Sequence, residues 1–453
     1  MRLPSLDESR PLRYAAVFYM YVMQGIPAGF ALTAVANRLA AAGVSPPVIG
    51  RFVALVGVPW TVQFFWGPVI DRFQGSPMGR RKPWVFFAQL LALAASLLVL
   101  LVRDPARQVG TLMLVFFVHS VFASVQDASV DAMAITVSRP EERARVNAYM
   151  RAGLLVGDGV GAAVLASVMA RYGFTAAAAV QSGVLLAFTV FTFVLRERRG
   201  DALVPWGRAR RPESVPAGAP GGEPPAPALT ASVRLIVADA LRGMLAPASR
   251  RLFGAIWAVF FAASVYLRVL STTLVQGLHW SDTRLSVLSG TWGTAAAAAA
   301  ILASGAAAGR LGARRLLLGV VGVIAAYLVA FNLLAPLWPN AGLAGAAYVV
   351  WHTFDPAYCV ASFPVLMALC RDGVEGSQFT AYMALVNFSD VAGNYVAGYA
   401  MTVFPAPAIG FACAAVALAA LAVLHRSRLG ATADASLRAG APAYVPAARA
   451  AAA

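Results

Sequence analysis

Long apolar runs alternate with short polar stretches along most of the 453-residue chain. A helix that spans a bilayer needs about 20 apolar residues, and twelve runs reach that length. The runs lack the alternation of polar and apolar positions that barrel strands carry. Because a backbone in lipid must satisfy its own hydrogen bonds, the pattern predicts an all-α membrane protein with 12 transmembrane helices. We expect these at roughly 14–38, 47–70, 84–102, 110–137, 146–170, 174–195, 252–276, 284–308, 314–336, 341–369, 377–402 and 406–425.

Composition agrees with this interpretation. The chain is 60% hydrophobic and 12% charged, with a mean hydropathy of +0.70, whereas soluble domains are about 25% charged. The formal charge of +16 is concentrated in every second loop, most strongly at 72–82, 139–145, 196–211, 310–315 and 426–428. This positive-inside pattern predicts cytoplasmic termini, so the charge is explained by topology and not by nucleic-acid binding. The N-terminus shows no cleavable signal peptide, and the three cysteines and the other residues suggest no metal or cofactor site.

Residues 199–230 interrupt the pattern with a Pro-, Gly- and Ala-rich stretch, which predicts a flexible cytoplasmic linker. Residues 231–247 resume helical spacing and predict an interfacial helix. We therefore divide the chain into an N-terminal six-helix half at 1–198, a linker with this helix at 199–250, a C-terminal half at 251–428 and a disordered tail at 429–453.

The two halves show traces of a duplication. The loop WGPVIDRFQGSPMGRRKPW (66–84) is echoed by GAAAGRLGARR (305–315), and after a five-residue insertion the offset between the halves is 233. That offset carries His119 onto His352 and the tripeptide Ala-Tyr-Met at 148–150 onto 381–383. Two repeated halves around a midplane cavity are the architecture of a secondary transporter.

The repeated loop has two physical interpretations. A glycine lets helices approach closely, and an acidic helix end can pair with an arginine or cap a helix of the opposite half. Such contacts would latch the halves in one state. The alternative is topological anchoring by positive charge alone. The candidate latch residues are Gly67, Asp71, Arg72, Gly79, Arg80 and Arg81.

The motif Gly-x-x-x-Asp-Arg…Gly-Arg-Arg over 67–81 resembles the loop 2–3 signature of the major facilitator superfamily. The segment DRFQGSPMGRRKPW (71–84) is similar to the loop of AmpG-type permeases, which import anhydromuropeptides, and the stretches at 21–30, 53–68 and 123–144 agree. After the linker, YMALVNFSDVAGNYVAG (382–398) looks more like the acetyl-CoA transporter branch, and RhtX/FptX-type siderophore permeases share the N-terminal half. The resemblance implies a transporter of a large amphipathic solute.

Ionisable residues within the apolar runs are candidates for function, because a charge at the bilayer centre costs about 2.5–3.5 kcal/mol on insertion scales. Asp127 and Asp131 lie one turn apart on one helix face. Asp127 is deeper and is our first choice for a proton-carrying carboxylate, with a static ion pair as the alternative. Asp131 lies nearer the cytoplasm, where it could instead pair with Arg143 or Arg145.

Two histidines and a third carboxylate complete the candidates for proton coupling. His119 and His352 occupy equivalent places, and Asp355 follows His352 by three residues. A His–Asp pair on one helix face would change charge between pH 5 and 8. The alternative is that both histidines make interhelical hydrogen bonds.

Arginines and other polar residues at similar depth are candidates for substrate binding. Arg268 lies deep in its run and is our preferred ligand for an anionic group, with neutralisation of a neighbouring Asp as the alternative. Arg151 lies nearer the cytoplasmic end, where it could simply snorkel. The remaining substrate-binding candidates are Gln126, Asp158, Asn387, Asp390, Asn394 and Trp60.

These observations predict a proton-coupled symporter that works by alternating access in a cytoplasmic (inner) membrane. Its partners are a small-molecule solute, protons and the lipid bilayer, and we expect a monomer. The sequence shows no nucleophile–His–carboxylate set and no phosphate-binding loop, so an enzyme is disfavoured. The resemblance implies an anhydromuropeptide-like substrate, with a siderophore or an acetyl-CoA or other CoA thioester as alternatives.

Overall fold

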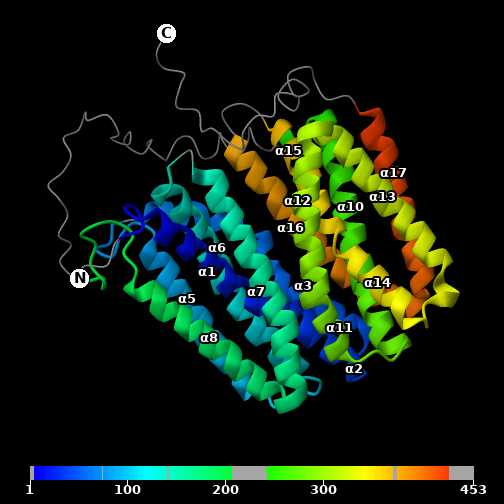
Figure 1. Cartoon of the computed structure of the whole chain (residues 1–453), viewed down its shortest axis with the longest axis horizontal. Helices are drawn as coiled ribbons and strands as arrows, with labels where there is room; N and C mark the ends of the chain where they lie inside the picture. The colour runs from blue at the N-terminus through cyan, green and yellow to red at the C-terminus, as the bar shows by residue number, and fades with distance from the viewer. Residues whose placement is uncertain (1–4, 74, 140–141, 207–241, 371–374, 428–453) are drawn as a thin grey trace, which may run out of the picture.

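A computed structural model describes residues 5–73, 75–139, 142–206, 242–370 and 375–427. Its N-terminal part is a bundle of helices (Figure 1). The first span is interrupted by η1 and the second by η2. The elements are α1 (Arg10–Gly29), the π-helical η1 (Phe30–Val35), α2 (Ala36–Ala41), α3 (Pro46–Thr61), η2 (Gln63–Phe65), α4 (Trp66–Arg72), α5 (Lys82–Leu98), η3 (Val99–Leu101), α6 (Val109–Val137), α7 (Arg143–Tyr172) and α8 (Phe174–Val194).

A second bundle lies beside the first, with α5 and α8 on one flank of the molecule and α13 and α17 on the opposite flank (Figure 1). Its elements are α10 (Pro247–Thr272), the π-helical η5 (Thr273–Gly277), α11 (Asp282–Leu288), the π-helical η6 (Ser289–Gly293), α12 (Thr294–Leu311), α13 (Ala313–Leu333), η7 (Ala335–Leu337), α14 (Ala341–Trp351), α15 (Phe354–Ala368), α16 (Glu375–Val403) and α17 (Ala406–Arg426).

The predicted all-α membrane fold is confirmed. Within the described residues, ten helical stretches are long and apolar enough to cross a membrane. The two other expected spans correspond to α14 with α15, which a break separates, and to the 29-residue α16. Most of the predicted linker and interfacial helix, and the tail from 429, lie outside the described residues.

Helices α1 and α7 pack with their backbones almost in contact, because glycines line both faces. A Cβ at Gly161 would lie 2.1 Å from the Ile26 carbonyl oxygen, and one at Gly157 would lie 2.3 Å from that of Val22. Gly153 continues the same four-residue spacing on α7. Small residues at such intervals are the usual means of close packing between membrane helices, where dispersion contacts drive association.

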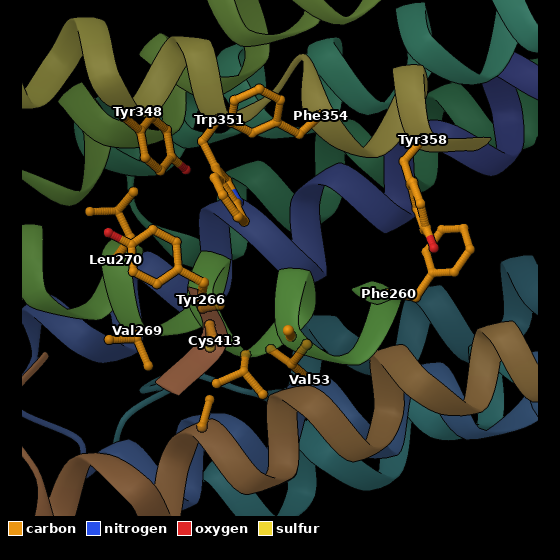
Figure 2. Close-up of a cluster of buried hydrophobic side chains, with 14 of the residues drawn as sticks. Val53, Phe260, Tyr266, Val269, Leu270, Tyr348, Trp351, Phe354, Tyr358 and Cys413 are labelled. Carbon is orange, nitrogen blue, oxygen red and sulfur yellow. The ribbon is translucent and has the colours of Figure 1, made fainter. Parts of the chain in front are cut away.

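The C-terminal bundle is held by aromatic side chains around the break between α14 and α15 (Figure 2). Trp351, the last residue of α14, packs edge-on against Tyr266 at 4.8 Å and against Phe354, the first of α15, at 5.3 Å between ring centroids. The Tyr358 hydroxyl donates to the Ile256 carbonyl oxygen at 3.0 Å. Such pairs contribute about 0.5–1.5 kcal/mol each beyond area burial, so they fix the direction of both helix segments.

Contacts between the two bundles gather at the end that carries residues 42–45, 278–281 and 404–405, which we call the closed end (near α2 and α11 in Figure 1). The Asn37 amide donates to Ser286 Oγ at 3.0 Å, and the Gln276 amide donates to the Val44 carbonyl oxygen at 2.8 Å. Among the residues that the structure describes, the hydrogen bonds between the bundles lie from mid-helix to this end.

Glycines let the bundles touch in the same region. A Cβ at Gly159 of α7 would lie 2.6 Å from the carbonyl oxygen of Gly290 in η6, and a Cβ at Gly290 would lie 2.5 Å from that of Gly159. On the other side of the interface, a Cβ at Gly50 of α3 would lie 2.5 Å from the Asn394 carbonyl oxygen of α16. Closure therefore depends on positions that have no room for a side chain.

At the opposite end, a buried ion pair joins three helices of the N-terminal bundle. Arg13 of α1 is only 2% exposed. Its guanidinium donates to the Val137 carbonyl oxygen at the end of α6 (2.9 Å) and to Glu142 at the start of α7 (2.7 Å). Arg10 also pairs with Glu142. Burial acts to raise the pKa of Glu142, but Arg13 and Arg10 outweigh it and hold that pKa below its usual range.

Replacing Glu142 with Gln is expected to lower the melting temperature of the purified protein by roughly 5 °C at pH 7, because the buried Arg13 would lose its counter-charge. A carboxyl whose pKa is lowered by folding stabilises above its ordinary pKa of about 4.3 and stops doing so as the pH falls through the folded value. The gap between the two melting temperatures should therefore close below about pH 4. Glu8→Gln is the control, since its pair with Arg199 at 3.5 Å is solvent-exposed. Equal melting temperatures for the wild type and Glu142→Gln at pH 7 would contradict the assignment.

Candidate functional site

Two carboxylates on α6 accept hydrogen bonds from other helices of the N-terminal bundle. The Gln63 amide of η2 donates to Asp127 Oδ2 at 2.5 Å. The Tyr21 hydroxyl of α1 donates to Asp131 Oδ1. The interruption of the second span at η2 places Gln63 opposite α6. In the described part of the chain, no ion pair joins Asp131 to Arg143 or Arg145, so this structure does not show that alternative.

Arg151 of α7 interacts electrostatically with both of these carboxylates. Its charge acts on Asp127 and Asp131 of the same bundle and also on Asp355 at the start of α15 in the other bundle. The side chain is exposed, but its electrostatic interaction with three carboxylates gives it a role that snorkelling alone would not. The position of Arg151 along its own helix did not reveal this role.

Asp355 interacts in turn with Asp390 of α16, whose carboxylate accepts a hydrogen bond from Ser264 of α10. We call Asp127, Asp131, Arg151, Asp355 and Asp390 the central cluster. It joins both bundles through electrostatic interaction, and carboxylates outnumber arginines in it.

Arg268 of α10 lies apart from the central cluster and is buried. Its Nε donates to the Asn394 side-chain oxygen at 3.0 Å, and its Nη2 donates to the Leu32 carbonyl oxygen of η1 at 3.2 Å. Both acceptors are uncharged. Within the described residues Arg268 makes no ion pair with a carboxylate. The structure therefore does not show the alternative, in which Arg268 neutralises a neighbouring Asp.

The two histidines make interhelical or local hydrogen bonds. His119 is buried, and its Nδ1 contacts the Ala92 carbonyl oxygen of α5 at 2.9 Å. His352 contacts the Tyr348 carbonyl oxygen through Nδ1 and Ser289 Oγ through Nε2, both at 2.9 Å. A nitrogen that faces a carbonyl must carry the proton. The Ser289 hydroxyl can donate to Nε2, so a neutral His352 ring satisfies both contacts.

The predicted pair of His352 and Asp355 is wrong in this structure. α14 ends at Trp351 and α15 begins at Phe354, and the two ring nitrogens of His352 contact the Tyr348 carbonyl oxygen and Ser289 Oγ and not Asp355. A three-residue spacing implies one face only where the helix is continuous.

Four further substrate-binding candidates lie within the membrane helices. The Asn387 amide donates to the Trp60 carbonyl oxygen at 3.2 Å and thereby bridges the bundles. Gln126 is buried and lies 3.5 Å from the Met20 carbonyl oxygen. Asp158 is half-buried on α7, where its backbone packs against Gly25 and Gly29. These positions stay predictions as substrate contacts.

The loop at 66–84 is fixed to its own bundle. The carboxylate of Glu197 accepts from the backbone nitrogens of Arg81 (2.8 Å) and Lys82 (3.1 Å). Gly79 has φ +122° and packs against Glu197, where a Cβ would lie 2.6 Å from Oε2. A Cβ at Gly67 would meet nothing within 4 Å, so Gly67 makes no close helix approach in this structure.

The latch itself stays a prediction. Arg72 ends α4 with its guanidinium 6.0 Å from the ring centroid of Phe73. Arg80 and Arg81 have interaction partners in the structure, and the side chain of Asp71 lies outside the described residues.

Sequence comparison decides the family. A sequence model of the Major Facilitator Superfamily matches residues 15–393. The chain belongs to the major facilitator superfamily. It is therefore a multi-pass membrane transporter.

Curated relatives resemble only part of this superfamily member. An uncharacterized protein of Haemophilus influenzae is 32% identical over 111 residues, which are 23% of this chain and 26% of the relative. The anhydromuropeptide permease of Escherichia coli K12 is 30% identical over 113 residues, 24% of this chain and 23% of the permease. The matched stretches thus span about a quarter of each of these proteins.

Solved transporters share the fold over nearly the whole length. The nucleoside transporter NupG superposes with a TM-score of 0.66 at 11% identity, covering 91% of this chain and 98% of its own. The inward open conformation of the E. coli xylose transporter XylE gives a TM-score of 0.65 at 10% identity, covering 93% and 98%. At this identity the likeness concerns the fold alone.

Proposed function

We propose that this superfamily member is a proton-coupled symporter that imports a large amphipathic solute by alternating access. The observation that supports this proposal is the excess of carboxylates over arginines deep inside the membrane. Five carboxylates lie deep in the spans, Asp127, Asp131, Asp158, Asp355 and Asp390, whereas Arg151 and Arg268 are the arginines at comparable depth in the described residues and Arg51 lies nearer a membrane surface.

Such an imbalance is costly when water is excluded. An unpaired buried carboxylate shifts toward its neutral form, because burial penalises the charged one. Asp127 and Asp131 share one cation, Arg151. When the two halves close around a loaded site, uptake of a proton by one of the pair would remove the excess charge and permit the movement. Asp127 is our preferred proton carrier, because its partner Gln63 belongs to the interrupted second span.

The histidines have a smaller part in this proposal. Both have hydrogen-bond partners that a neutral ring satisfies, so we assign them to holding α6 against α5 and α14 against η6. Asp355 is kept as the carboxylate of the opposite half that competes for Arg151.

We assign the closed end to the outside of the cell and the arginine-rich loops to the cytoplasm, following the positive-inside pattern. With the contacts between the halves gathered at the closed end, this orientation makes the structure an inward-facing state. We likewise assign the protein to the cytoplasmic membrane, with both termini inside.

For the substrate we favour an anhydromuropeptide-like solute. Support comes from the 30% identity to the E. coli anhydromuropeptide permease, although this covers 24% of the chain. Arg268, held by uncharged partners, and the exposed Arg151 could each bind a carboxylate of such a solute. A siderophore or a CoA thioester would also carry anionic groups and is the alternative on the same scaffold.

The test is uptake of labelled anhydromuropeptide into proteoliposomes, with and without an inward proton gradient. We expect accumulation only with the gradient. Arg268→Lys should retain part of the uptake and Arg268→Gln should raise the half-saturating concentration about tenfold, since a charged hydrogen bond is lost. Absence of uptake by folded protein would shift the substrate to the siderophore or CoA-thioester class, to be tested in the same liposomes.

A further inference from the structure

A charged side chain lies on the surface of α3 within a membrane-spanning helix. Arg51 is exposed and belongs to the candidate span Pro46–Ile70. It follows the start of α3 by five residues, which is about 7–8 Å along the helix axis. A guanidinium at that depth can reach the headgroup layer by extending its stem, and it needs an anionic partner there.

Two tyrosines of the opposite half lie beside Arg51. Tyr395 and Tyr399 of α16 are 46% and 42% exposed, and their ring centroids are 5.0 Å apart. Arg51 is near enough to interact electrostatically with the Tyr395 hydroxyl. Together with Val396 and Ala400 the tyrosines line an open groove of about 530 Å³.

The groove faces away from the central cluster. Asp390 and Tyr395 are five residues apart on α16, which places them about 140° apart around the helix axis. Between these two flanks, α3 and α16 are in backbone contact at Gly50 and Asn394. The tyrosine flank is therefore the outer one, toward the bilayer.

We propose that this groove binds the phosphate headgroup of a membrane phospholipid, with Arg51 and the hydroxyls of Tyr395 and Tyr399 as donors. Guanidinium groups bind phosphate oxygens through paired, charge-assisted hydrogen bonds, and tyrosines favour the depth of the headgroups. The acyl chains would lie along the exposed Val396.

The position of the groove gives the lipid a conformational role. Arg51 comes from one half and the tyrosines from the other, so the complete site exists only while α3 and α16 touch at the closed end. A ligand that binds one state better shifts the population toward that state. The bound lipid thus stabilises the arrangement in which the closed end is shut, whatever solute the protein carries.

The test measures closure of this end while phosphatidylglycerol is titrated into protein held in neutral maltoside micelles. Spin labels at Ala42 and Phe404, both exposed and in opposite halves, report the distance between the halves in a background with the three native cysteines replaced by alanine. Lipid should increase the short-distance population. Arg51→Gln should need about tenfold more lipid for half the effect, and Arg51→Lys should fall between.

Arg171→Gln is the matched control. Arg171 is also exposed at this end beside a tyrosine, with its guanidinium 5.5 Å from the Tyr172 ring centroid, but both residues belong to one helix end. It should respond to lipid as the wild type does. An unchanged lipid response in Arg51→Gln, or an equal loss in Arg171→Gln, would overturn the proposal. Closure produced by inorganic phosphate alone would identify a soluble anion in place of lipid and would overturn it as well.

Discussion

Replacing Asp127 with Asn is expected to abolish proton-driven accumulation while leaving solute exchange intact. An inward gradient of about two pH units supplies about 2.7 kcal/mol per proton, enough for roughly 100-fold accumulation with one proton per solute. Asn resembles the protonated carboxyl in shape and charge, so the variant should still close around its substrate. We expect its accumulation ratio in proteoliposomes to fall to about 1.

Exchange of labelled for unlabelled solute without a gradient is the companion measurement, because it needs both conformations but no net proton movement. The control is Asp104→Asn, which changes a carboxylate in a loop that pairs with Arg107. Wild-type accumulation by Asp127→Asn would remove Asp127 from the coupling mechanism and make Asp131, its neighbour on α6, the next residue to test.

Replacing Gly159 with Val should arrest transport by holding the closed end open. A Cβ at this position would lie 2.6 Å from the Gly290 carbonyl oxygen and 3.1 Å from Thr294 Oγ1. Forcing additional carbon atoms into a packed contact typically costs about 1–3 kcal/mol, which corresponds to a decrease of roughly tenfold or more in the closed population and in uptake. The distance between spin labels at Ala42 and Phe404 should lengthen accordingly.

Gly254→Val is the matched control, because it also adds a branched side chain to a membrane helix but its Cβ would meet nothing within 4 Å. Its uptake should equal that of the wild type. If Gly159→Val transported normally, the contact between α7 and η6 would not be part of the cycle.

The sequence predicted the helices well and the breaks within them poorly. Hydropathy placed most helix ends within a few residues, since the cost of unpaired backbone in lipid fixes their length. The π-helical segments η1, η5 and η6, and the gap between α14 and α15, have no comparable signal. They depend on packing, such as the aromatic contacts of Trp351, which a single helix does not reveal.

The same reason explains the errors at the candidate site. Pairing His352 with Asp355 assumed a continuous helix. Depth along one helix gave Arg151 a minor role, although its charge reaches carboxylates of both halves. The contribution of Tyr21 and Gln63 was missed because both lie on other helices. The four-residue spacing of Gly153, Gly157 and Gly161 is a further signal, for close helix packing, that the sequence prediction did not use.

The excess of carboxylates over arginines in the membrane has an electrical consequence. If the protons that enter in one cycle outnumber the negative charges of the solute by one, each cycle carries a positive charge across the bilayer. A membrane potential of 100 mV, negative inside, then contributes about 2.3 kcal/mol per cycle. The voltage alone would thus drive uptake when the pH is the same on both sides, and a current would report each turnover.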